Sequence, residues 1–294
     1  AALSSRFRLS LVAAAVSLSH ARKSVRASRP MASVSADASA ADGSRLQQQL
    51  ESVHISEPPR IELTFAPPLP GATDGGAVGV LDSSFNPPTR AHVHMLNLAA
   101  AQHGFTRTLL LLAKQNADKP VVGASLVQRL QMMQLVAAAD PVCAMHCGVT
   151  AHPLFVDKAA ALQSHFGADC KIYVLVGYDT WVRITDPKYY PEGALNDVLA
   201  RLFEAVNIVV TSREVGDAAG DVSVDAQRDR VASLAGLANG RLHFLCNDET
   251  MAQYSSSALR TAIAAGEPEV ARGMLPECLV EFVGSLGLYD TPRG

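Results

Sequence analysis

The sequence predicts an α/β fold with a mostly parallel sheet and helices on both faces. Short apolar runs rich in Val, Leu and Ile alternate with segments whose apolar residues recur every three or four positions, and this alternation is typical of such sheets. The runs Leu109–Leu112 and Tyr173–Val176 contain no alternating polar residues, as expected for strands buried on both faces. We therefore expect one Rossmann-like domain without internal repeats.

The elements follow one another in regular order along the chain. Bounded apolar runs predict six strands, at residues 77–82, 108–113, 142–149, 171–177, 206–211 and 241–246. Helical spacing predicts five helices between them, at residues 91–104, 125–139, 153–167, 194–205 and 224–238. Ligands of such sheets bind at the carboxyl ends of the strands, so the loops after these strands are the expected location of the site.

The first part of the chain predicts a targeting leader over residues 1–45. It is rich in Ala, Ser and Arg, and its first acidic residue is Asp37. This composition is typical of a transit peptide for a chloroplast or mitochondrion, whereas a short apolar stretch at 9–18 leaves a secretory signal as the alternative. Met31 offers an internal start for an untargeted cytoplasmic or nuclear form.

A proline-rich stretch at residues 66–71 marks the boundary of the folded body. We expect a linker over 46–74 and the folded domain over 75–294, beginning near Gly75. The full chain has 25 Lys+Arg and 28 Asp+Glu. Six of the basic residues lie in the first 30 positions, so the remainder has a balance of −9. That balance argues against a nucleic-acid partner, and no segment reaches the roughly 18 apolar residues of a membrane span.

The cysteines predict free thiols and no metal site. The chain has five of them, an odd number, and they are widely spaced. Cys143 and Cys147 would face one side of a strand and His146 the other, so we do not expect these residues to hold a metal.

The first stretch with chemical content is SSFNPPTRAH, residues 83–92. It leads from the first strand through a turn into a helix, whose N-terminal amides favour an anion. His92 falls in the first helical turn, where it could donate to a phosphate oxygen. The chain contains neither G-x-G-x-x-G nor a P-loop string, so phosphates must be held in another way.

The second stretch is YSSSALR, residues 254–260, which follows the sixth strand and opens a helix. Its serines supply hydroxyls and N-terminal amides, and Arg260 supplies a fork of donors. Taken alone, it would equally be a serine-capped helix with an exposed arginine.

Together, the two stretches resemble the signatures of the nucleotidyltransferase family with the T/HxGH-like motif. SSFNPPTRAH is similar to GSFNPxTxxH and YSSSALR to ISSTxIR. Within that family the chain looks most like nicotinamide or nicotinate mononucleotide adenylyltransferases, because its ending at 275–289 resembles their closing VPxxVxxYIxxxxLY. The resemblance covers roughly residues 77–290. It implies AMP transfer from ATP to a pyridine mononucleotide, with pyrophosphate released and Mg²⁺ bound with ATP.

The resemblance also implies roles for particular residues. His92 would bond the ATP phosphates, Ser84 and Phe85 would give backbone contacts to the nucleotide, and Arg260 would hold the β- and γ-phosphates. Three serines would share that last role: Ser255, Ser256 and Ser257. The partners would thus be small molecules, and a homo-oligomer stays open.

Further candidates follow the second and fourth predicted strands. Gly177 and Asp179 match the family's GxD, in which the aspartate contacts nucleotide, although Asp179 would also suit a helix N-cap. Lys114 would meet a phosphate or lie exposed on a loop. Trp181 or the pair at Tyr189 and Tyr190 would stack on the pyridine ring or pack a loop.

The sequence also departs from the family pattern. Ser83 stands where relatives commonly have Gly, Thr89 replaces the first histidine of HxGH, and residues 180–191 are unlike the common enzymes. Three alternatives therefore stay open: a cytidylyltransferase, a phosphopantetheine adenylyltransferase, and a nucleotide sensor without turnover.

Overall fold

The computed structural model describes residues 36–68, 76–114, 123–213 and 222–290. Most of the predicted leader and its internal start at Met31 lie outside these ranges, so targeting stays a prediction. No helix in the described ranges is both long and apolar enough to cross a membrane.

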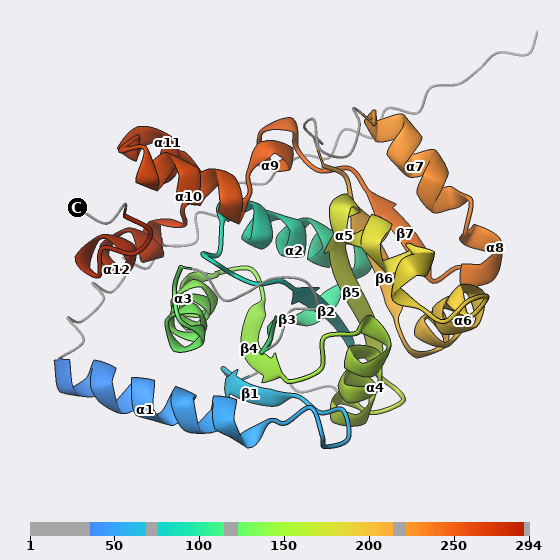
Figure 1. Ribbon diagram of the computed structural model, residues 1–294, viewed down its shortest axis with the longest axis horizontal. Coiled ribbons are helices and arrows are strands. Elements are labelled where there is room, and N and C mark those ends of the chain that lie inside the picture. Colours follow the sequence, from blue (N-terminus) through green and yellow to red (C-terminus); the bar gives the residue numbers. More distant parts are fainter. Residues whose placement is uncertain (1–35, 69–75, 115–122, 214–221, 291–294) are drawn as a thin grey trace, which may run out of the picture.

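The described strands form one seven-stranded sheet in the order β1-β4-β3-β2-β5-β6-β7, in which only β1 runs antiparallel (Figure 1). The strands are β1 (Glu62–Phe65), β2 (Ala77–Asp82), β3 (Phe105–Ala113), β4 (Ala144–Thr150), β5 (Lys171–Gly177), β6 (Asn207–Thr211) and β7 (Leu242–Leu245). All six predicted strands are confirmed, and β1 is an addition. The chain winds outward from β2 through β3 to β4 and then crosses to β5 on the other side, so the winding reverses at β2.

Helices cover both faces of the sheet, as expected. One face packs against α1 (Ala36–Ser52), α2 (Arg90–His103), α3 (Leu126–Ala139) and the C-terminal α10 (Ser256–Ala264), α11 (Pro268–Met274) and α12 (Val280–Ser285). The other face packs against α4 (Phe155–Phe166), α5 (Tyr178–Ile184), α6 (Leu195–Ala205), α7 (Val224–Ala232) and α8 (Ala235–Ala238). The short α9 (Glu249–Gln253) lies against α2, and 3-10 turns occur at Pro187–Tyr189 and Glu277–Leu279.

The central strand β3 is buried on both faces of the sheet, as its continuous apolar run predicted. In β3, Leu110 and Leu112 point into one core and Leu109 and Leu111 into the other, and all four are buried. Because successive strand residues face opposite sides, a strand without polar positions needs a covering layer on each face. The helices supply both layers.

The linker predicted over residues 46–74 is wrong for its first part. Residues 36–52 form α1. Its Leu46 and Leu50, together with Val53, are buried in the hydrophobic core on one face of the sheet. The strand β1 then pairs with β4. The sequence pattern gave little indication of a helix here, because α1 has only a few large apolar residues. Its stability therefore comes mainly from packing on α3.

The five cysteines are free thiols. Cys147 is buried in one core, whereas His146 lies on the opposite side of β4 near Arg107, as the strand pattern predicted. Within the described ranges, no group of three or more potential metal-ligating side chains is present.

Candidate active site

A pocket of about 810 Å³ lies at the carboxyl ends of the parallel strands. Its lining includes Asp82 at the end of β2, Gly177 at the end of β5, and Arg213 and Asn247, which follow β6 and β7. The pocket therefore occupies the point where the winding reverses at β2, which is where open α/β sheets bind ligands. Its volume is in the range of small-molecule sites.

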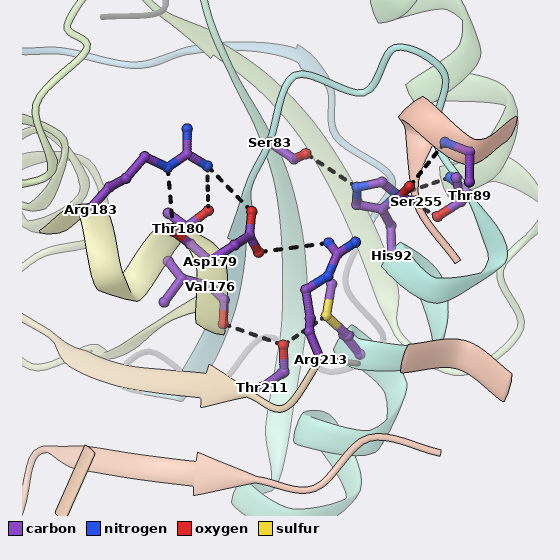
Figure 2. A network of polar contacts seen from close by, with 12 residues as sticks. Ser83, Thr89, His92, Val176, Asp179, Thr180, Arg183, Thr211, Arg213 and Ser255 are labelled. Atoms are coloured by element: carbon purple, nitrogen blue, oxygen red, sulfur yellow. Dashed lines mark hydrogen bonds and ion pairs between the residues drawn. The ribbon is translucent and has the colours of Figure 1, made fainter. Parts of the chain in front are cut away.

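His92 lies in the first turn of α2, and its ring takes part in the N-terminal cap of that helix. Thr89 is the N-cap of α2, and its backbone N–H donates to His92 Nδ1 at 2.9 Å (Figure 2). His92 is thus the third helical residue of a capping box, a position where Glu or Gln usually makes this bond. The ring also packs on Phe85, with 5.3 Å between centroids.

This bonding pattern fixes the tautomer of His92. Because Nδ1 accepts a hydrogen bond, the proton of the neutral ring is on Nε2, and Nε2 donates to Ser83 Oγ at 3.1 Å. Burial, and secondly the charge of Arg213, lower the pKa of His92 to about 4. At neutral pH the ring is therefore an uncharged donor whose N–H faces the pocket.

The two signature stretches meet at this edge of the sheet although they are far apart in the chain. Arg260 donates to Asn86 O at 2.7 Å, and Ser256 Oγ donates to Pro87 O at 2.8 Å. Ser255 caps α10 by accepting from Ala258 N–H, at 3.0 Å. The N-termini of α2 and α10 consequently open onto one pocket, and such termini favour anions.

A row of charged side chains lines the pocket from α5, which follows β5 directly, and from the residues after β6. Asp179 lies 3.3 Å from Arg183 and 3.7 Å from Arg213, and Figure 2 shows the aspartate between the two guanidinium groups. The N-cap of α5 is Gly177, with no side-chain cap bond. Asp179 is therefore in the first turn of α5, and the alternative that it caps this helix is wrong.

The pocket is positive although the body of the protein is negative. Five cationic side chains line it against the two aspartates Asp82 and Asp179: Arg129, Lys158, Arg183, Arg213 and Arg260. Arg129 is buried, and its guanidinium donates to the backbone oxygens of Ala124 and Ser84. Such a concentration of donors in a concave site suits a ligand with several phosphate groups.

The structure brings most of the predicted site residues to this pocket. The residues that line it are His92, Ser84, Gly177, Asp179, Tyr189, Tyr190, Ser255, Ser256, Ser257 and Arg260. Phe85 does not line it, because its side chain is buried beneath His92. Its φ of 44° lies in the left-handed region, which is uncommon for a bulky residue and turns the chain toward Asn86.

Two predicted site residues are corrected. Lys114 is neither at the pocket nor on an exposed loop, because its ammonium donates to Leu50 O at 2.9 Å and Val53 O at 3.3 Å. It thus binds the carbonyl end of α1, where a cation is favourable. Trp181 is 2% exposed and packs with Phe203 in the core, so its stacking on a ligand ring is wrong and its packing alternative holds.

Sequence reasoning missed several lining residues. Arg129 and Lys158 each occupy the apolar stripe of a helix, beside Leu130 and Ala159 respectively. A charged residue at such a position needs a partner, and that requirement was the available signal. Arg213 comes two residues after β6 ends, so the rule about strand ends would have found it.

The lining residues of the pocket indicate how Mg²⁺ could be held there. Both lining aspartates are already paired with cations, and the described residues offer no cluster of three ligating side chains. Because Mg²⁺ keeps several waters and is commonly held by substrate phosphates, the chain fits a metal that arrives on a triphosphate better than a protein-held ion.

Comparison with known proteins gives concordant findings. The family model described as cytidylyltransferase-like matches residues 80–262. A Schizosaccharomyces pombe protein assigned by name as a nicotinamide mononucleotide adenylyltransferase is 33% identical, over 71% of this chain and 85% of the relative. A Gloeobacter violaceus protein assigned as a nicotinate-nucleotide adenylyltransferase is 25% identical, over 75% of this chain and 99% of the relative.

The fold is also similar to that of solved structures. The nicotinic acid mononucleotide adenylyltransferase of Plasmodium falciparum complexed with NaAD matches with a TM-score of 0.56 at 12% identity, over 73% of this chain and 97% of that one. At this identity the likeness shows the arrangement of elements alone.

Proposed function

Because the chain belongs to the cytidylyltransferase-like family, we propose that it transfers AMP from ATP to a pyridine mononucleotide. The products are pyrophosphate and a dinucleotide, which is NAD or its acid analogue. The enzyme is a nucleotidyltransferase of the nicotinamide or nicotinate mononucleotide type, in agreement with the names of its relatives.

The observation that carries this function is the junction of the two signature stretches. The bond from Arg260 to Asn86 O joins the turn before α2 to the start of α10. It sets the Nε2–H of His92, the guanidinium of Arg260 and two helix N-termini around one cavity. A triphosphate needs several donors converging from different directions, and these groups provide them.

The chemistry asks for positioning and charge stabilisation, not for a covalent intermediate. A phosphate oxygen of the mononucleotide attacks the α-phosphorus of ATP, and the bond to the β-phosphate breaks with its electrons leaving on pyrophosphate. We propose that His92 donates to a phosphate oxygen at the reacting end, while Arg260 and Ser255, Ser256 and Ser257 hold the β- and γ-phosphates. Such preorganised donors usually supply the largest share of catalysis.

We propose that Mg²⁺ enters with ATP. When bound to the phosphates, it would neutralise part of the charge that develops on the leaving pyrophosphate. The pairing of Asp82 with Lys158 and of Asp179 with Arg213 supports a metal held by the phosphates of ATP and not by these carboxylates. We propose that Asp179 and Tyr189, which line the same pocket, contact the nucleosides.

The test is an assay with the purified full chain, Mg²⁺, and each pairing of ATP or CTP with nicotinamide or nicotinate mononucleotide. We expect a dinucleotide and pyrophosphate with ATP and at least one acceptor. Product with CTP alone would support a cytidylyltransferase instead. ATP binding without any product would support the sensor.

A further inference from the structure

One wall of the pocket contains an ion pair to which the proposed phosphate contacts assign no role. Lys158 Nζ lies 2.6 Å from Asp82 Oδ2, and the two side chains are 6% and 10% exposed. Asp82 ends β2 and Lys158 is in α4, which the fold brings together at the pocket. Because both side chains are almost fully buried, the pair forms part of the pocket wall.

Stability does not explain this pair. Removing two charges from water costs about as much as their attraction returns, so a buried ion pair is a weak stabiliser. The cost is higher here because Asp82 Oδ1 is enclosed and has no hydrogen-bond partner. A buried carboxylate oxygen normally has a donor, so an unpaired one in the wall of a ligand pocket points to a donor on the ligand.

The surroundings of the pair differ from the phosphate end of the pocket. The Lys158 ammonium lies 4.6 Å from the centre of the Phe155 ring, and Pro153 and Leu154 line the same wall. This wall follows β4, on one side of β2, whereas Arg213 and Ser255–Ser257 follow strands on the other side. An apolar wall with one polar pair suits a flat ring that carries one polar substituent.

We propose that Asp82 and Lys158 together select a carboxamide over a carboxylate on the ring of the acceptor. This inference rests on the proposed function and names the acceptor of that same site as nicotinamide mononucleotide. Lys158 offers N–H donors and Asp82 offers an acceptor beside them. A primary carboxamide carries one acceptor and one donor group in the same arrangement, so its C=O receives from Lys158 and its N–H donates to Asp82.

Reaching the carboxamide requires only a small change in Asp82. The torsion that turns an aspartate carboxylate is broad and roughly two-fold, so Asp82 can keep its bond to Lys158 while it turns an oxygen toward the ligand. The orphaned oxygen then gains its missing donor when the substrate binds.

The acid form of the acceptor lacks that donor. Its second carboxylate oxygen would face Asp82, placing two anionic acceptors together without a proton between them. A site that hydrogen-bonds a substrate N–H discriminates strongly against an analogue without it, because its own polar group stays unpaired. We expect the amide to bind tighter than the acid by about tenfold or more.

The experiment measures binding without turnover. The full chain is loaded with a non-hydrolysable ATP analogue and Mg²⁺, then titrated calorimetrically with nicotinamide mononucleotide and, separately, with nicotinate mononucleotide. The readout is the ratio of the two dissociation constants, in the wild type, in Asp82→Asn and in Lys158→Gln. Thermal unfolding of each variant verifies that it is folded.

The two variants should move the ratio in opposite directions. Asp82→Asn removes the repelling charge and leaves Lys158 free for a carboxylate, so the preference for the amide should fall about tenfold. Lys158→Gln leaves the Asp82 charge without its cation, so the preference should rise. Asp179→Asn is the matched control, because it changes the other lining aspartate and should affect both acceptors equally.

Other outcomes overturn the inference or its premise separately. A wild type that prefers the acid, or variants that weaken both acceptors by the same factor, would reduce the pair to a packing role or to contact with the ribose. Failure of both mononucleotides to bind the loaded wild type would instead count against the proposed function.

Discussion

The neutral N–H of His92 is the donor on which the proposed chemistry depends most. Replacing His92 by Gln should separate its two structural tasks. Glutamine is a usual third residue of a capping box, so it can keep the bond to Thr89 N–H that His92 makes at 2.9 Å. It cannot at the same time present a donor where Nε2 now meets Ser83 Oγ. The variant should therefore fold normally and lose the pocket donor alone.

The size of the loss follows from the role of the donor. One preorganised donor to charge that develops in the transition state contributes about 2.7–4 kcal/mol, which is roughly 10²–10³ in kcat. His92→Gln should show that loss with an unchanged melting temperature. His92→Ala should show the same kcat and, because it also loses the cap, about 1 kcal/mol of stability.

The assay is steady-state turnover of ATP and nicotinamide mononucleotide alongside thermal unfolding. If His92→Gln retained kcat within about threefold of the wild type, the assignment of a phosphate donor to Nε2 would be refuted. A wild-type kcat in His92→Ala, with lowered stability, would leave His92 only its capping role.

Three further predictions concern proton linkage, the first helix and the triphosphate. The pKa of His92 is lowered to about 4 in the folded chain, so as the pH falls below 6.5 the unfolded chain protonates this histidine before the folded chain does. The wild type should therefore lose up to about 3 kcal/mol of unfolding free energy between pH 7 and 4. Chemical denaturation at the two pH values should show a smaller loss in His92→Gln. Leu46→Ala should lower the free energy of unfolding by about 2.7–5 kcal/mol, because Leu46 is fully buried. The control Gln48→Ala, at an exposed position of the same helix, should lower it by under about 0.5 kcal/mol. Equal melting temperatures for the two variants would show that α1 does not stabilise the rest of the domain. Arg260→Ala should raise the KM for ATP at least tenfold more than the KM for the mononucleotide, and equal effects would contradict its place at the β- and γ-phosphates.

Much of the fold was predictable because its central strands are buried on both faces. Runs such as Leu109–Leu112 leave no polar position, so they require two covering layers, and the intervening helices have the right period to provide them. The antiparallel β1 and the helix α1 were not predictable on the same grounds. The helix α1 has few large apolar residues and β1 has only four residues, and each depends on contacts with α3 or β4 that are distant in the chain.

The candidate site was predictable where a motif coincided with a strand end. His92 and Arg260 were found in this way, and both line the pocket. Lys114 also follows a strand, but the strand end could not show that α1 would return and take its donors. The pairing of Asp82 with Lys158 joins residues on two elements, and no local pattern relates them.

The central claim is that the AMP moiety of ATP, with its α-phosphate, is transferred to a pyridine mononucleotide. The most direct measurement supplies the full chain with Mg²⁺, ATP labelled at its α-phosphorus and, in parallel, nicotinamide or nicotinate mononucleotide, and follows the label together with released pyrophosphate. We predict that the label enters the dinucleotide in a one-to-one ratio with pyrophosphate. Label that stays in ATP, or that appears as free AMP or ADP without dinucleotide, would contradict the claim.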